Sequence, residues 1–166
     1  MKRRGADSEL LIVVDLQRAF SVPSRLVERI RRYAQRFPRR VFTRFENRPG
    51  SLFRTKLKQR CCAPGTPDMS LLVAPGKGDV VFTKKGYGIA PRQIRRIRAL
   101  GVKRVTVCGV DTDACVLGVM FSLFDAGIDC CVKADLCWSS SGRALHAAGM
   151  KIIERQFPPP KRRHAR

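Results

Sequence analysis

The stretch Leu10-Leu11-Ile12-Val13-Val14-Asp15 (LLIVVD) decides the fold class of this 166-residue chain. Its consecutive apolar side chains leave no polar face, which is typical of a parallel strand that helices cover on both sides. The run ends in a carboxylate, Asp15, where such a strand reaches the edge of its sheet. We therefore expect Leu10–Asp15 to be a buried strand of an α/β protein.

Strand-like and helical patterns alternate along the rest of the chain. Further strands are expected at Val41–Phe45, Asp79–Thr83, Lys103–Cys108 and Ile128–Lys133, and helices at 24–37, Pro91–Leu100, Asp113–Ala126 and Gly142–Phe157. This alternation predicts a three-layer, doubly wound α/β sandwich around a parallel sheet of five strands, with a sixth left open. Residues 46–78 are rich in Pro and Gly and are expected to form a long, mostly irregular connection with a functional role.

The length fits one domain, placed at residues 1–157 and followed by a basic tail, 158–166, that is expected to be disordered. The 34 basic and 13 acidic residues give a net charge of +21, which favours nonspecific binding of nucleic acid. No base-reading motif accompanies this charge. No apolar run reaches the ~18 residues of a membrane span, and the seven cysteines form no Cys-x-x-Cys pair. We expect a reduced, cytoplasmic protein.

Three reactive side chains follow predicted strands. Asp15 ends the first strand, Lys84 follows the third and Cys115 follows the fourth. Because ligands of parallel sheets bind beyond the carboxyl ends of the strands, we expect these side chains to converge. A thiol at a helix start beside a lysine is expected to have a lowered pKa, and a carboxylate can take its proton. The arrangement predicts acyl transfer to sulfur and hydrolysis of a thioester.

Three motifs in this order resemble those of the isochorismatase-like cysteine hydrolases, the superfamily that contains nicotinamidases and carbamoylsarcosine amidase. The motifs are Val13–Gln17, Phe82–Tyr87 and Cys108–Val116, and the resemblance extends from about Leu10 to Gly149. It implies that Cys115 is the nucleophile, that Asp15 accepts its proton and that Lys84 completes the triad. It also implies a cis peptide between Val110 and Asp111, an oxyanion hole formed by the backbone N–H groups of Asp111 and Cys115, and assembly into dimers or tetramers.

The chain departs from the family at three places. Nicotinamidases carry a metal-binding Asp-x-His motif and further histidines after the second strand, whereas Thr43–Arg48 contains no histidine, so we expect no metal and no other cofactor. Gly88 stands where the family has a serine after the tyrosine of the second motif. The C-terminus ends early, so we expect five strands rather than the six of the family.

The substrate stays open. Side chains expected to line the pocket are Gln17, Arg44, Asn47, Arg48, Tyr87 and Trp138. The positive charge of the two arginines favours an anionic small molecule. The leading hypothesis is metal-free cleavage of a C–N bond in a small amide, carbamoyl or ureido compound. Two alternatives remain: a catalytically silent protein that binds nucleic acid or an acidic partner, and an isochorismate-type vinyl-ether hydrolase, whose activity would survive Cys115→Ala. The other cysteines are assigned no chemistry: Cys108, Cys130 and Cys131 are expected in strands, and Cys61, Cys62 and Cys137 in loops.

Overall fold

The computed structural model describes residues 9–158, which contain one five-stranded parallel sheet. Its strands are β1 (Glu9–Val14), β2 (Arg40–Phe45), β3 (Val80–Lys84), β4 (Arg104–Val110) and β5 (Cys130–Trp138), in the order β3-β2-β1-β4-β5. Every neighbouring pair is parallel. The predicted five-stranded parallel α/β fold is confirmed.

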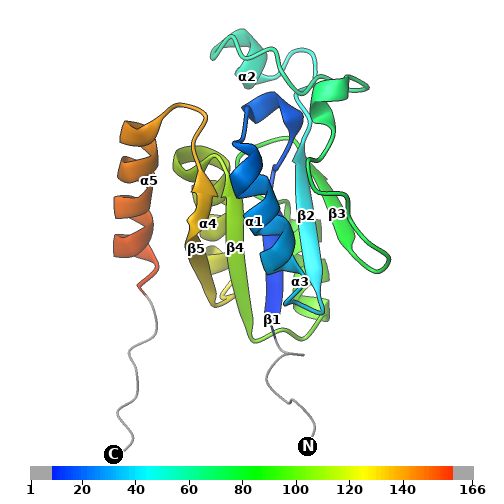
Figure 1. Ribbon diagram of the computed structural model, residues 1–166, viewed down its shortest axis with the longest axis vertical. Coiled ribbons are helices and arrows are strands. Elements are labelled where there is room, and N and C mark those ends of the chain that lie inside the picture. The colour runs from blue at the N-terminus through cyan, green and yellow to red at the C-terminus, as the bar shows by residue number, and fades with distance from the viewer. Residues whose placement is uncertain (1–8, 159–166) are drawn as a thin grey trace, which may run out of the picture.

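Helices cover both faces of the sheet, with α1 in front and α3 and α4 behind, while α5 lies beside β5 (Figure 1). Their bounds are α1 (Ser24–Ala34), α3 (Pro91–Ala99), α4 (Leu117–Asp125) and α5 (Arg143–Gln156). The long helices begin within a few residues of their predicted starts. The exception is the segment expected to be helical from Asp113, which opens with a wider turn, Thr112–Val116, before α4 begins.

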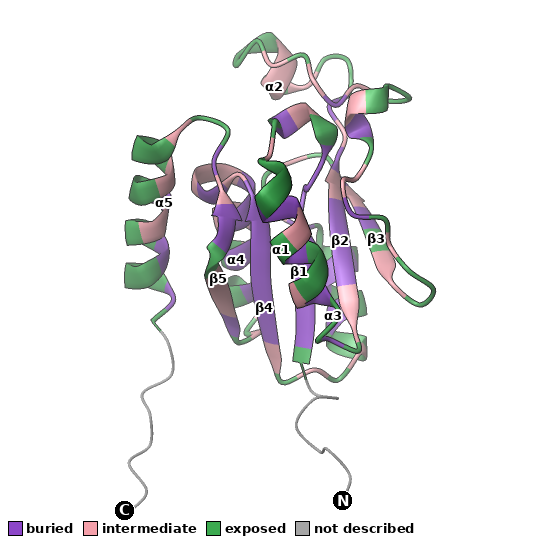
Figure 2. Ribbon diagram, in the orientation of Figure 1, coloured by how far each residue is buried: buried purple, intermediate pink, exposed green. Residues whose placement is uncertain are grey.

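The centre of the sheet is the core of the molecule. Residues Leu10–Val14 of β1 are completely buried, and Figure 2 shows β1 and β4 as the most continuously buried strands. On α1, Leu26, Val27, Ile30 and Ala34 recur at helical spacing and are buried, whereas the arginines lie on the outer side. Each large apolar side chain buried in this way contributes about 1.5–3 kcal/mol.

Strand β5 is longer than predicted, because its pairing with β4 is interrupted and then resumes. Val107 pairs with Val132, but Gly109 pairs with Cys137, so the residues between Val132 and Cys137 bulge out of the ladder. The polar residues of this bulge look like the end of a strand in the sequence. The predictions that the strand ends at Lys133 and that Cys137 lies in a loop are therefore wrong.

The connection 46–78 is irregular apart from the short helix α2 (Leu52–Thr55) and a 3-10 turn at Pro67–Met69. Its part around α2 lies beyond the carboxyl ends of the strands (Figure 1). The predicted tail, 158–166, falls outside the described residues except for Pro158. Within residues 9–158, no helix is both long enough and apolar enough to cross a membrane.

Candidate active site

The strand order reverses between β1 and β4, and the predicted reactive residues gather at the carboxyl end of this pair. Asp15 directly follows β1, and Cys115 lies in the wide turn after β4. Lys84 is the last residue of β3, and its side chain passes the Phe45 ring at the end of β2, with Nζ 5.3 Å from the ring centroid. The switch point of such a sheet is where ligands bind.

The Lys84 ammonium joins the three side chains. Its Nζ lies 2.7 Å from Asp15 Oδ2, and it donates to Cys115 Sγ at 3.1 Å and to the Gly86 carbonyl at 2.7 Å. An ammonium has three protons, so each one has an acceptor. The side chains of Lys84 and Asp15 are 1% and 0% exposed, and Cys115 is 8% exposed. The cluster is therefore almost dry.

Burial decides the protonation of Cys115. Burial is the largest effect and raises the pKa of the thiol; the Asp15 carboxylate also raises it, Lys84 only partly offsets both, and the resulting pKa is about 12. Burial lowers the pKa of Lys84, but its interactions with the Asp15 carboxylate and the Cys115 sulfur outweigh burial, so the net shift is upward and the lysine stays charged. The expectation of a lowered thiol pKa is wrong, because it counted the lysine and neglected desolvation. The resting sulfur carries a proton and hydrogen-bonds Asp15.

Thr43 of β2 holds the Asp15 carboxylate. Its hydroxyl donates to Asp15 Oδ1 at 2.6 Å and accepts the Asp15 backbone N–H at 3.1 Å. Asp15 has φ +44°, a left-handed conformation that aspartate tolerates better than most residues. Thr43 is completely buried, and the sequence analysis did not include it among the site residues. Its only signal in the sequence is its place near the end of a predicted strand.

The turn that carries Cys115 is fastened to the connection between β5 and α5. The turn is one residue wider than an α-helical turn, since the Val116 N–H donates to the Asp111 carbonyl at 3.0 Å. The peptide bond between Val110 and Asp111 is cis. Three side chains then anchor the turn: Asp111 accepts from the N–H and hydroxyl of Ser140 at 2.8 and 2.7 Å, Asp113 accepts from Ser139 at 2.5 Å, and Thr112 hydrogen-bonds His146 at 2.8 Å.

Two glycines let other elements approach the site closely. A Cβ atom on Gly149 of α5 would lie 2.8 Å from Asp113 Cα, so α5 packs directly on the backbone of the turn. A Cβ atom on Gly88 would lie 2.2 Å from the hydroxyl oxygen of Ser122. That hydroxyl, which comes from α4, accepts the Ile89 N–H at 3.3 Å. A serine hydroxyl from a different element thus lies against the backbone at Gly88, where the family pattern has a serine.

Two of the predicted pocket residues use their amides within the protein. Gln17 donates to the carbonyls of Phe45 and Met69 at 3.1 Å each and accepts the Phe45 N–H at 2.8 Å. The Asn47 amide donates to the carbonyls of Gln59 and Cys61 at 2.9 and 3.1 Å and accepts from Ser51 at 2.7 Å. Both side chains are completely buried. In this conformation they hold the long connection against the sheet.

The other four predicted pocket residues differ in position. Arg44 lies between Thr43 and Phe45 on β2, so its side chain is on the opposite face and donates to Thr83 at 3.2 Å; a place for it in the pocket is not supported. Arg48 is exposed and pairs with Glu46 at 2.5 Å. Tyr87 is 46% exposed. Trp138 pairs in register with Val110, beside the turn of Cys115.

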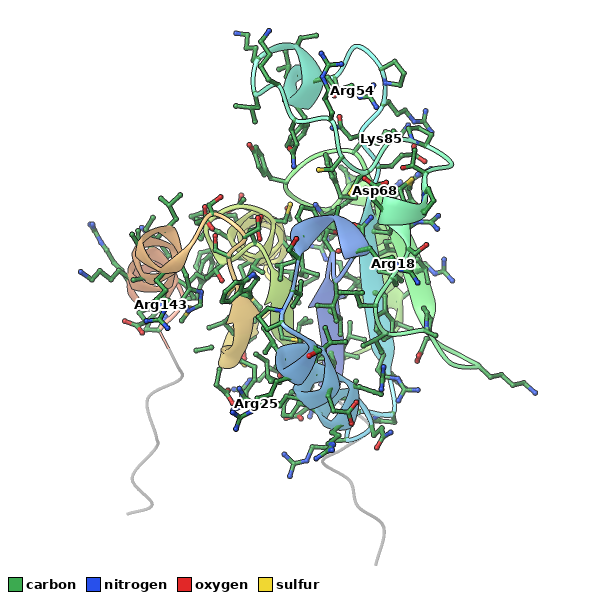
Figure 3. All side chains as sticks on the ribbon, turned by 45° about the horizontal axis from the view of Figure 1, so that its top comes forward. Arg18, Arg25, Arg54, Asp68, Lys85 and Arg143 are labelled. Atoms are coloured by element: carbon green, nitrogen blue, oxygen red, sulfur yellow. The ribbon has the colours of Figure 1, made fainter. Side chains whose placement is uncertain are left out.

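The helix α2 closes over this end of the sheet. Phe53 contacts the rings of Phe45 and Tyr87, with centroid distances of 4.8 and 4.9 Å. Figure 3 shows Arg54 and Lys85 at this same end of the molecule. Within residues 9–158, Arg54 Nε and Trp138 Nε1 are buried and have no hydrogen-bond partner. These two donors therefore have no partner among the described residues.

A family model described as "Isochorismatase domain" matches residues 9–160. The chain belongs to the isochorismatase family. Its fold is similar to that of a pyrazinamidase of Pyrococcus horikoshii solved in complex with zinc, with a TM-score of 0.79, 22% identity, and coverage of 90% of this chain and 96% of the other. It is also similar to PnC1 of L. infantum in complex with nicotinate (TM-score 0.77, 19% identity, 91% and 90% coverage).

A further structural neighbour of this isochorismatase-family chain is a cysteine hydrolase from Pseudomonas syringae pv. phaseolicola (TM-score 0.74, 18% identity, 92% and 87% coverage). At these identities the neighbours establish the fold. Comparison with curated protein sequences finds no match.

The residues after β2 do not suit a metal such as the zinc named for the pyrazinamidase. The Glu46 carboxylate pairs with Arg48, and the Asn47 side chain is engaged with backbone carbonyls and Ser51. In the described part of this isochorismatase-family chain, no three or more His, Cys, Asp or Glu side chains come together as a possible metal site.

Proposed function

We propose that this protein is a cysteine hydrolase that cleaves a C–N bond in a small amide, carbamoyl or ureido compound, with Cys115 as the nucleophile. The supporting observation is the Lys84 ammonium, which contacts the Asp15 carboxylate and the Cys115 sulfur at once. Acyl transfer needs a nucleophile, a base and a means of holding them together, and this cluster has all three. Relatives described as a pyrazinamidase and a cysteine hydrolase are consistent with that chemistry.

In the first half of the reaction, Asp15 takes the Cys115 proton as the sulfur attacks the substrate carbonyl. Because burial raises the pKa of the thiol, the sulfur stays protonated until a carbonyl carbon is in reach. Lys84 keeps its charge and orients both partners. The backbone N–H groups of Asp111 and Cys115 receive the oxyanion, a contribution of about 3–4 kcal/mol where a single donor has been removed.

In the second half, the Asp15 proton passes to the leaving nitrogen, the C–N bond breaks, and the acyl group remains on Cys115 as a thioester. Asp15 then takes a proton from water, whose oxygen attacks the thioester carbonyl. The C–S bond breaks, the proton held by Asp15 returns to the sulfur, and the acid leaves. Asp15 thus serves as a base and then as an acid during formation of the thioester, and again as a base and then as an acid during its hydrolysis.

The substrate of this proposed reaction is a small anion. The stretch 48–60 of the connection carries five cations and no carboxylate: Arg48, Arg54, Lys56, Lys58 and Arg60. The buried Arg54 Nε and Trp138 Nε1 supply donors for a carboxylate or a carbonyl. Since Cys115 is only 8% exposed, the connection has to move aside for the substrate to enter.

Ammonia release from pairs of small amides tests the proposal, each pair being a carboxylate-bearing compound and its neutral isostere. We expect turnover of the anionic member to vanish in Cys115→Ala and to persist in Cys131→Ser, which removes a half-buried thiol elsewhere. Equal turnover of both members would reject the anionic preference. Activity toward a vinyl ether that survives Cys115→Ala would instead support ether hydrolysis.

A lack of turnover, together with salt-sensitive binding of nucleic acid or an acidic protein, would support the silent binding protein. A binder that makes several phosphate contacts loses orders of magnitude in affinity between about 50 and 200 mM salt. The same titration on Cys115→Ala serves as the control, because binding through the surface does not need the thiol.

A further inference from the structure

Two adjacent thiols, Cys61 and Cys62, lie in the connection that covers the candidate site, and the proposed reaction uses neither. Cys62 is completely buried, whereas Cys61 is half-buried. Gln59 Nε2 donates to Cys61 Sγ at 3.4 Å, and the Cys62 thiol also hydrogen-bonds that sulfur. A donor directed at a sulfur atom stabilises its thiolate, and of the two sulfurs that receive an amide N–H only Cys61 is partly exposed to solvent, so Cys61 is the reactive member of the pair.

The hydrogen bonds, above all the one from Cys62, lower the pKa of Cys61 to about 6, while burial and the Asp68 carboxylate oppose this shift. The pKa of Cys62 is raised because its proton is held by Cys61 and because it is buried. Of the two thiols, Cys61 therefore ionises more readily and Cys62 keeps its proton longer. This is the combination in which one sulfur attacks an oxidant and the other then completes a disulfide.

The backbone fixes the two cysteines in place. The Asn47 N–H donates to the Cys62 carbonyl at 2.7 Å, and Asn47 Nδ2 donates to the Cys61 carbonyl at 3.1 Å. The Cys62 N–H donates to Asp68 Oδ2 at 2.7 Å. These bonds hold the backbone of both residues in one conformation. An oxidised Cys61 therefore keeps the Cys62 sulfur close to its own.

We propose that Cys61 and Cys62 form an oxidisable dithiol that closes to a disulfide when the protein meets a hydroperoxide. The Cys61 thiolate attacks the terminal oxygen of the hydroperoxide; an S–O bond forms, the O–O bond breaks and the alkoxide leaves (hydroxide where the oxidant is hydrogen peroxide), so the sulfur is oxidised and the peroxide is reduced. The Cys62 sulfur then attacks Cys61, the S–S bond forms, the S–O bond breaks, and water leaves with the Cys62 proton.

A disulfide between adjacent residues is strained and therefore easily reduced. Adjacent Cα atoms are 3.8 Å apart across a trans peptide, below the 4.4–6.8 Å usual for disulfides. The strain makes the bond easier to reduce, which is typical of regulatory rather than structural disulfides. A cellular dithiol would return the pair to its reduced state.

The pair is linked to the candidate site through Gln17, whose Nε2 donates to Cys62 Sγ at 3.6 Å as well as to the carbonyls of Phe45 and Met69. Closing the disulfide moves the Cys62 sulfur away from this amide. Oxidation therefore loosens the connection at the point where it meets the sheet. This last step rests on the proposed function: we expect slower amide hydrolysis in the oxidised protein.

Mass spectrometry of the tryptic peptide 61–77 tests the dithiol independently of any activity. The full chain is treated with hydrogen peroxide, blocked with iodoacetamide and digested; the peptide contains both cysteines and no others. We expect it to lose two hydrogen atoms and both alkylation sites, and to regain both sites after treatment with dithiothreitol. Oxidation of Met69 adds an oxygen atom and is distinguished by mass. Cys131 in the same sample should remain alkylated.

Two variants separate the roles of the sulfurs. In Cys62→Ser, Cys61 should be trapped as a sulfenic acid or proceed to a sulfinic acid; in Cys61→Ser, Cys62 should stay reduced. Formation of a sulfinic acid at Cys61 in the wild-type chain with no disulfide, or a pair that stays reduced while Cys131 is oxidised, would overturn the proposal. A disulfide that forms in a protein without amidase activity would leave the dithiol standing and reject the proposed function.

Discussion

The carboxylate of Asp15 acts on Cys115 in two opposed ways. In the proposed reaction it accepts the thiol proton as a base, and its charge also raises the pKa of that thiol. Lys84 acts in the other direction, because its ammonium stabilises the thiolate. Substituting the carboxylate should therefore have opposite effects: the Cys115 thiol ionises more readily, but the substrate is turned over more slowly.

In Asp15→Asn we expect iodoacetamide to alkylate Cys115 faster than in the wild type at pH 8–9, because the thiol pKa falls while Lys84 remains. Amide hydrolysis should decrease by about 100-fold or more, the usual contribution of a general base. Alkylation is followed by peptide mass spectrometry against pH, with Asp125→Asn at the exposed end of α4 as the control. Slower alkylation in Asp15→Asn would show that its charge does not set the pKa of Cys115.

Thr43 positions the base and touches neither the sulfur nor the substrate. Thr43→Val removes the hydrogen bond to Asp15 Oδ1, a bond to a charged group that is worth about 1.5–3 kcal/mol. We expect kcat to fall by about 10- to 100-fold with little change in KM, and Thr43→Ser to restore most of it. Steady-state kinetics check both variants. Full activity in Thr43→Val would mean that the Thr43 hydroxyl is not needed to position the Asp15 carboxylate.

The sequence predicted that Asp15, Lys84 and Cys115 converge, because each lies in a local motif at the end of a strand or after it, and the structure brings the three side chains together. It could not identify Thr43, whose contact with Asp15 depends on how the ends of β1 and β2 meet. It also led to the wrong direction for the Cys115 pKa, since the burial of the thiol depends on side chains distant in the sequence. The sequence shows which reactive groups follow the strands, but it does not show how far the Cys115 thiol is removed from solvent.

Among the secondary-structure elements, α5 has the most direct contact with the turn of Cys115. The Ser139, Ser140 and His146 side chains at its start hold that turn, and Gly149 lets the helix backbone approach it. The amphipathic pattern of the sequence predicted the helix α5. It did not predict that α5 packs on the turn, because a glycine inside a helical pattern does not indicate which backbone it contacts.

Gly149→Ala tests this packing. The added Cβ would lie 2.8 Å from Asp113 Cα and 2.9 Å from its nitrogen, so α5 or the turn has to shift. We expect a loss of about 1–3 kcal/mol of stability, the usual cost of overpacking, although alanine favours a helix more than glycine does. Amide hydrolysis should decrease as well. Thermal unfolding measures the first effect.

The control for Gly149→Ala is Ala148→Ser, which alters the preceding, exposed residue of the same helix. It should leave both the unfolding temperature and the activity nearly unchanged. An unfolding temperature for Gly149→Ala at or above that of the wild type would mean that the turn yields to the new methyl group without cost, and that α5 does not constrain it.

At the scale of the whole molecule, the net charge of +21 creates a positive electrostatic field around the protein, and no single ion pair neutralises it. The sequence predicted this charge and its spread, but not which part of it lies near the site. The structure brings the cationic connection to the carboxyl ends of the strands (Figure 3). There the field can guide a small anion toward Cys115.

We therefore expect kcat/KM for a carboxylate-bearing amide to fall several-fold between 50 and 500 mM NaCl, while the value for its neutral isostere stays constant. Added salt shortens the screening length from more than 10 Å to only a few ångströms, which removes steering but leaves direct contacts in place. Lys56→Gln and Lys58→Gln in the connection should reproduce the loss at low salt. Arg95→Gln, on the exposed side of α3 behind the sheet, should not. Parallel salt dependences for the two substrates would mean that the charge of the connection serves something other than substrate capture.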